Sequence, residues 1–102
     1  MTIEFHPQAM RDLIDAQIYY KDISLDLGRD FRRKADASVQ IIQSSPTHFH
    51  PLNSRSRFRR ANLKRFPYHL IYEIIDPAEF IRVVVVRHDR RHPAFGLNRR
   101  WS

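Results

Sequence analysis

The chain has 102 residues, no cysteine and a formal net charge of +7 at neutral pH. This length suits a single compact domain, and a chain without cysteine excludes disulfides, zinc–thiolate sites and a thiol nucleophile. We therefore expect one domain over residues 1–102, with a basic C-terminal tail from about residue 89.

The sequence shows no targeting or membrane signal. Residues 1–7 lack the basic and apolar pattern of a signal peptide, and no apolar run approaches the ~20 residues that span a bilayer. We expect a cytoplasmic protein that does not associate with a membrane.

The positive charge is concentrated in the second half of the chain. Residues 1–54 hold six Lys or Arg against seven Asp or Glu, whereas residues 55–102 hold twelve against four. Fifteen of the eighteen cations are arginine, which favours bidentate contacts with phosphate or carboxylate. The pattern indicates an anionic partner, and RNA, DNA and an acidic protein all remain open.

The first half predicts a short strand over residues 3–5 and then two helices. Pro7 suits the first turn of a helix, and apolar residues recur at steps of three and four over residues 9–20. A connection at residues 24–28 leads to a second amphipathic helix, which should end near Pro46 because proline disfavours helical geometry in the residue before it. Two helices with so short a joint form an antiparallel hairpin.

The second half predicts three strands, at residues 58–64, 68–75 and 80–88, because these segments are rich in β-branched and aromatic residues. Asp76-Pro77-Ala78-Glu79 is a turn between the last two. The order β-α-α-β-β-β predicts an α+β fold with the N-terminal helical hairpin packed on one face of an antiparallel sheet. Val83–Val86 is apolar on both faces, so unless the tail folds over it we expect an exposed apolar strip that binds a protein partner.

At this level the chain resembles the RelE/ParE superfamily of type II toxin–antitoxin toxins over nearly its whole length. The resemblance is carried by Pro7-Gln8-Ala9, Asp12-Leu13, Tyr19-Tyr20, Gly28, Phe31, Arg60, the block Phe66-Pro67-Tyr68-His69-Leu70-Ile71-Tyr72 and the block His88-Asp89-Arg90-Arg91-His92-Pro93. It implies a growth-inhibiting toxin in a hetero-oligomer with a cognate antitoxin, whose acidic segment folds on binding.

The superfamily has two functional branches. RelE-like proteins cut mRNA in the ribosome, and metal-free RNA cleavage needs a base, an acid and stabilisation of the developing charge. Under that reading the chain is a metal-independent endoribonuclease with Arg60, Lys64, Arg87 and His88 as catalytic residues. However, no tyrosine follows Tyr72, so the end of the chain offers no phenol for catalysis. Residues 55–65 also contain no carboxylate that could act as the base. The alternative for His88 is a structural role, in which it caps the strand end and hydrogen-bonds a carboxylate.

The long H-x-R-R-x-P ending looks more like the ParE-type plasmid-stabilisation proteins, which inhibit DNA gyrase. We therefore predict a gyrase-binding toxin, with the ribosome-dependent endonuclease as the alternative and a small nucleic-acid-binding regulator as a second alternative. We expect no cofactor and no metal, since His48 and His50 have no third ligand nearby in sequence. The residues expected to contact target and antitoxin are Arg57, Arg59, Arg60, Arg65, Arg87, Arg90, Arg91, Arg99, Arg100 and Trp101.

Overall fold

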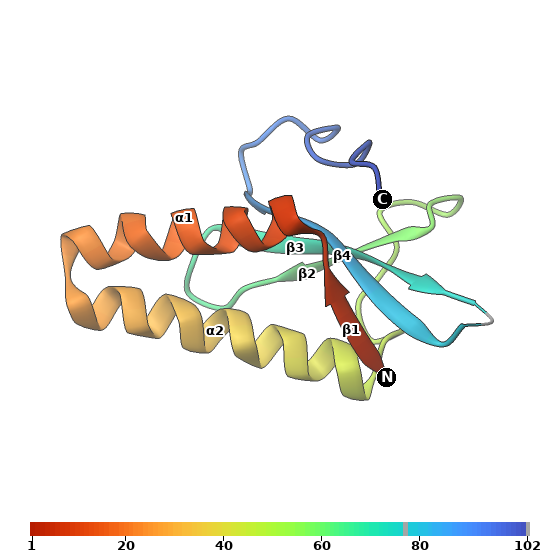
Figure 1. The fold of residues 1–102 in the computed structure, drawn as a ribbon, viewed down its shortest axis with the longest axis horizontal. Helices are drawn as coiled ribbons and strands as arrows, with labels where there is room; N and C mark the ends of the chain where they lie inside the picture. The colour runs from red at the N-terminus through yellow and green to blue at the C-terminus, as the bar shows by residue number, and fades with distance from the viewer. Residues whose placement is uncertain (77, 102) are drawn as a thin grey trace.

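A computed structural model describes residues 1–76 and 78–101, and its elements follow the predicted order (Figure 1). They are β1 (Thr2–Phe5), α1 (Pro7–Ile23), α2 (Leu25–Ser44), β2 (Phe58–Asn62), β3 (Tyr68–Ile75) and β4 (Phe80–His88). The predicted α+β fold with an N-terminal helical hairpin is confirmed. β2 ends at Asn62 rather than at Lys64, and Pro77 of the predicted turn lies outside the described residues. Among the described helices, none is long and apolar enough to cross a membrane.

The joint between the two helices is a single residue, Ser24. Its N–H donates to the Tyr20 carbonyl, ending α1, and its Oγ accepts from the N–H of Leu27, capping α2. The predicted connection over residues 24–28 is therefore wrong, because Gly28 lies inside α2. A Cβ at Gly28 would stand 2.8 Å from the Cα of Lys21, so the glycine is required for the close approach of the two helices.

The sheet is mixed, with strand order β1-β4-β3-β2. β2, β3 and β4 form the predicted antiparallel meander. β1 pairs in parallel with β4, with Ile3 opposite Ile81, so the prediction of a wholly antiparallel sheet is corrected at this edge. The reason is that the helical hairpin and the meander bring the last strand beside the first in the same direction (Figure 1).

Two apolar clusters occupy the two faces of the sheet. The larger one lies under the helices and includes Phe31, Tyr72 and Val83. The smaller one contains Ile71, Val84 and Val85. A register shift between Ile71 and Tyr72, which pair with Val85 and Val83, makes Val84 the extra residue of a β-bulge.

The C-terminal tail covers this smaller cluster. Phe95, Leu97 and Trp101 pack against it, together with Leu52 and Phe58. Figure 1 shows the tail leaving the end of β4 and looping back. The expectation of an exposed valine strip is therefore wrong for this fold, because the chain supplies its own apolar cover.

Candidate functional site

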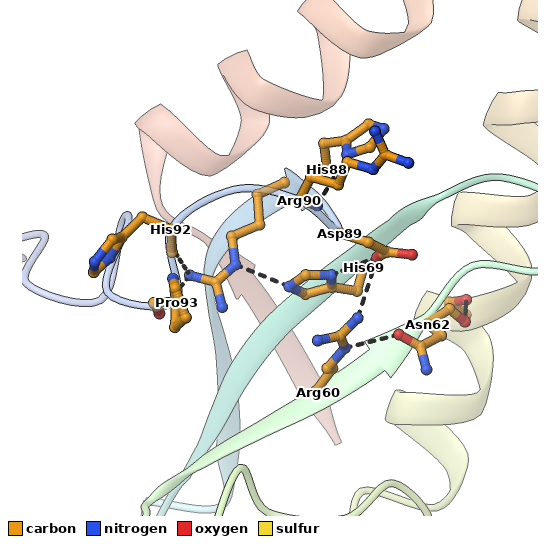
Figure 2. Close-up of polar contacts among 10 residues, drawn as sticks. Arg60, Asn62, His69, His88, Asp89, Arg90, His92 and Pro93 are labelled. Carbon is orange, nitrogen blue, oxygen red and sulfur yellow. Dashed lines mark hydrogen bonds and ion pairs between the residues drawn. The ribbon is translucent and has the colours of Figure 1, made fainter.

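A polar network of Arg60, His69, Arg87 and Asp89 joins three strands at one end of the sheet (Figure 2). His69 on β3 lies opposite Arg87 on β4, and Nε of Arg87 donates to Nε2 of His69 at 2.8 Å. Nδ1 of His69 lies 2.8 Å from Oδ1 of Asp89, which follows β4. Nη2 of Arg60, on β2, donates to the same oxygen at 3.2 Å. One carboxylate therefore receives bonds from two strands.

The centre of the polar network is buried. The exposed fraction is 1% for His69 and 5% for Arg87. Burial lowers the pKa of His69; the cations of Arg60 and Arg87 act in the same direction, while the hydrogen bond to Asp89 opposes them. Burial also lowers the pKa of Arg87, with a smaller contribution from Arg60. These surroundings favour a neutral imidazole beside a buried guanidinium.

Arg87 also holds the beginning of the C-terminal tail. Its Nη1 donates to the carbonyls of Pro93 and Phe95, both at 2.8 Å, and to that of His92 at 3.3 Å. In Figure 2, His92 and Pro93 lie on one side of the network and His69 lies nearer to Arg60 and Asp89. The guanidinium thus connects the central strands to the turn that starts the tail.

The end of the tail is anchored by Arg99 and Trp101. Arg99 forms a two-point ion pair with Asp12 on α1 and also donates to the Val84 carbonyl at 2.9 Å. The Trp101 ring meets the His6 ring edge-on at 5.0 Å between centroids, and the Arg82 guanidinium lies 4.6 Å from the Trp101 ring centre. The contacts of Arg99 and Trp101 therefore hold the end of the tail, and the contacts of Arg87 hold its beginning.

The four predicted catalytic residues do not converge. Arg87 and His88 are neighbours on one strand, so their side chains point to opposite faces of the sheet. Arg60 belongs to the polar network on the Arg87 side, while His88 packs edge-on against Tyr68 at 5.2 Å. Lys64 is exposed in the loop after β2. Figure 2 shows His88 separated from Arg60 by the other network side chains.

The predicted contact residues divide into an outward and an inward set. Arg87, Arg99 and Trp101 make the internal contacts described above. Arg59 and Arg60 are half-buried, and Arg59 donates to the Phe49 carbonyl at 2.7 Å. The exposed members are Arg57, Arg65, Arg90, Arg91 and Arg100. Of these, Arg57 pairs with Glu73 at 2.9 Å, and Arg65 pairs with Asp30.

Arg90 and Arg91 border a cleft of about 500 Å³ between α1 and the start of the tail. Its aromatic lining comes from Tyr19, Tyr68 and Phe95, and the Arg91 guanidinium lies 4.2 Å from the Phe95 ring centre. The remaining lining residues are Asp12, Asp15, Ala16, Val86, Arg87 and His88. The cleft therefore combines exposed cations with aromatic surface, which suits a peptide that carries carboxylates and apolar side chains.

A second cleft, of about 510 Å³, is lined by residues 48–52, Arg60 and Asn62. It contains both His48 and His50. Within residues 1–76 and 78–101, no three His, Cys, Asp or Glu side chains come together as a set of metal ligands.

The family assignment rests on the sequence itself. The family model described as the ParE toxin of the type II toxin–antitoxin system parDE matches residues 3–93. The chain belongs to the ParE toxin family. No curated protein matches the sequence.

Solved structures share the fold of this ParE family member. One, described as the chromosomal ParDE toxin–antitoxin system from P. aeruginosa, has a TM-score of 0.73 and 14% identity, covering 86% of this chain and 95% of that chain. Another, the toxin–antitoxin complex RelBE2 from Mycobacterium tuberculosis, has a TM-score of 0.62 and 21% identity, covering 85% and 95%. At these identities the likeness establishes the fold.

Sequence reasoning missed three residues of this ParE family toxin: His69, Asp89 and Asp12. His69 and Asp89 lie inside the two blocks that carry the resemblance, but nothing in their spacing indicates that they touch. Asp12 lies among the residues that carry the resemblance, but nothing in the sequence indicates that its carboxylate accepts from the N–H of Val86 at 3.1 Å and from Arg99. A register prediction for β3 and β4 would have placed His69 opposite Arg87.

Proposed function

We propose that this chain arrests growth by binding DNA gyrase in the cytoplasm, without cleaving RNA, and that a cognate antitoxin neutralises it. Membership of the ParE family supports the toxin role. The observation that carries the choice of target is the state of the Arg87 guanidinium. Arg87 and His88 both line the cleft, but this guanidinium is buried and bonded to His69 and to tail carbonyls. A nuclease needs its acid, base and phosphate-binding groups around one scissile bond.

The hydrogen bonding of His88 supports the same choice. Its Nδ1 accepts from the backbone N–H of Arg90 at 3.0 Å, so in the neutral ring the proton resides on Nε2. A neutral His88 therefore offers a donor at its free nitrogen, and a general base for the ribose hydroxyl would need an acceptor there. Arg87 is buried and bonded to His69 and to three carbonyls.

The exposed arginines supply the proposed contact surface. Arg90 and Arg91 lie beside the cleft, and Arg100 is exposed near the end of the tail. We propose that an acidic antitoxin segment covers this surface in a hetero-oligomer, since both related structures are described as toxin–antitoxin assemblies. Residues 1–102 would act as one domain, because the tail completes the smaller apolar cluster.

The test is a paired assay on the purified chain, with gyrase supercoiling in one arm and mRNA integrity in a reconstituted translating system in the other. We expect inhibition of supercoiling and intact mRNA. Arg90→Ala with Arg91→Ala should raise the concentration needed for half-inhibition by about tenfold or more. The matched control is Arg29→Ala with Arg33→Ala, which removes two exposed charges from α2, whose residues line neither cleft.

Three outcomes would contradict the gyrase proposal. Ribosome-dependent cleavage with normal supercoiling would establish the endonuclease alternative. Tight binding to duplex DNA without gyrase would favour the nucleic-acid-binding regulator. Equal loss of inhibition in the two double variants would show that net charge, rather than the surface beside the cleft, is responsible.

A further inference from the structure

The contacts of His69 define its tautomer. An arginine side chain has only N–H donors, so Nε2 of His69 must be the acceptor of the bond from Nε of Arg87. The proton of the neutral ring therefore resides on Nδ1, where it is donated to Oδ1 of Asp89. The ring is 1% exposed, so solvent and external ligands do not reach it.

His69 reaches both ends of the segment that presents Arg90 and Arg91. It binds Asp89, the first residue of that segment, directly. Through Arg87 it is connected to the carbonyl of His92, which closes the segment, and to those of Pro93 and Phe95. Two exposed guanidinium groups thus stand on a loop whose two ends are fastened through one imidazole.

We propose that His69 is a positioning residue for target binding: its neutral Nδ1–H imidazole fixes the loop 89–92, which presents Arg90 and Arg91 beside the cleft. This inference rests on the proposed function and specifies how the contact surface is kept in shape. A preordered loop binds more tightly than a mobile one, because less conformational entropy is lost on association.

Protonation of His69 would undo this arrangement. A proton on Nε2 would point at the N–H of Arg87. Two hydrogen-bond donors and two positive charges would then face each other. The charged groups that face the ring are Arg87 from β4, Asp89 beyond β4 and Arg60 from β2. The helices lie on the other face of the sheet, and within residues 1–76 and 78–101 no helix side chain forms a hydrogen bond with His69. Acid should therefore loosen the loop while the larger apolar cluster stays intact.

The first experiment is nitrogen-15 NMR of the imidazoles and the backbone in the wild-type chain. We expect a neutral Nδ1–H tautomer for His69, with a pKa below the ordinary histidine value of about 6.5, and with the amide signals of Arg90 and Arg91 shifting in step with His69. A neutral ring protonated on Nε2, or Arg90 and Arg91 amide signals that do not follow the protonation of His69, would overturn the proposal. This measurement needs neither gyrase nor antitoxin.

The second experiment uses His69→Gln and the control His50→Gln. The introduced amide can contact Asp89 or Arg87 but does not reproduce the ring that joins them. We expect His69→Gln to shift the amide signals of residues 89–95 while those of α2 stay unchanged, and to weaken gyrase binding about tenfold, equivalent to one average hydrogen bond. The affinity of the wild type for gyrase should fall on acidification, whereas the affinity of His69→Gln should depend less on pH.

The two proposals can fail separately. If neither the wild type nor the variant binds gyrase, the proposed function fails, while the imidazole and loop signals still decide the role of His69. If both bind equally at every pH, His69 does not position the contact surface. If His69→Gln does not fold, the deciding result is the wild-type experiment, in which the backbone amide signals of Arg90 and Arg91 are followed as His69 is protonated.

Discussion

Arg99 and Asp12 stand 87 positions apart in the chain and form a two-point ion pair, with Nη1–Oδ2 at 2.6 Å and Nη2–Oδ1 at 3.1 Å. Oδ2 of Asp12 also accepts from the N–H of Val86 at 3.1 Å. One carboxylate on α1 therefore fastens both β4 and the C-terminal tail. The side chains of Arg99 and Asp12 are only 11% and 18% exposed, so water does not readily replace these contacts.

Asp12→Asn should lower the free energy of unfolding by about 2–3 kcal/mol, because it leaves a largely buried guanidinium without its counter-charge. The matched control is Asp15→Asn on the same helix. Asp15 pairs with Arg11 at 3.8 Å, and both side chains are more than 60% exposed, so its loss should cost less than about 0.5 kcal/mol. Urea denaturation of both variants measures the difference. Equal midpoints would contradict the role assigned to Asp12.

Gly28→Ala should destabilise the chain by about 1–3 kcal/mol, although alanine is the better helix former. The added Cβ would stand 2.8 Å from the Cα of Lys21, and a backbone atom cannot move aside as a flexible side-chain end can. Ala37, exposed on the same helix, provides the comparison, since Ala37→Gly should cost about 1 kcal/mol through ordinary propensity alone. Thermal unfolding of both variants tests this; a stabilised Gly28→Ala would mean that the helices separate easily.

Gly96→Ala should detach the tail from the sheet. Gly96 has φ of +83°, which L-residues rarely adopt, and an added Cβ would lie 2.7 Å from the Cβ of Val85. We expect a cost of about 2 kcal/mol, confined mainly to the tail. Trp101 is the only tryptophan, so its fluorescence should report transfer to water while the helical circular dichroism is unchanged. Asn98→Ala, an exposed change in the same segment, should leave the emission unaltered.

Tyr72→Phe should change stability at alkaline pH. The Tyr72 hydroxyl donates to the Pro46 carbonyl at 2.6 Å, and burial raises the pKa of this phenol to about 12. Because the folded-state pKa is raised above the ordinary value of about 10, the contribution is fully present below pH ~10 and is lost as pH rises through about 12.

The difference in unfolding free energy between wild type and Tyr72→Phe should therefore narrow between pH ~10 and ~12, from an initial value of about 1–2 kcal/mol. Denaturation series at fixed pH values measure this difference. Subtracting the unfolding free energy of Tyr72→Phe from that of the wild type removes the contribution of the other tyrosines. A difference that is constant with pH would show that the phenol ionises equally in the folded and unfolded chains.

The sequence by itself determined the order of the elements and the family. Periods of three to four residues mark α1 and α2, and β-branched runs mark β3 and β4, because the side of an element that faces the core repeats with its own geometry. The blocks around Tyr68 and Arg90 indicated the superfamily, and the family match confirmed it. Gly28 was wrongly placed in the connection between the helices, because a glycine in a connection and one that lets two helices touch look alike in a single sequence.

Only the tertiary structure decided the position of the tail and the contacts of His69. The tail has no period, so nothing local predicts that Phe95 and Trp101 cover Val84 and Val85. The bond from Arg87 to His69 depends on the register of two strands, and the pair of Asp12 with Arg99 joins opposite ends of the chain. These contacts form only when the folded sheet brings distant residues together. For this reason Arg87 and Arg99, which look like surface cations in the sequence, are bonded inside the fold.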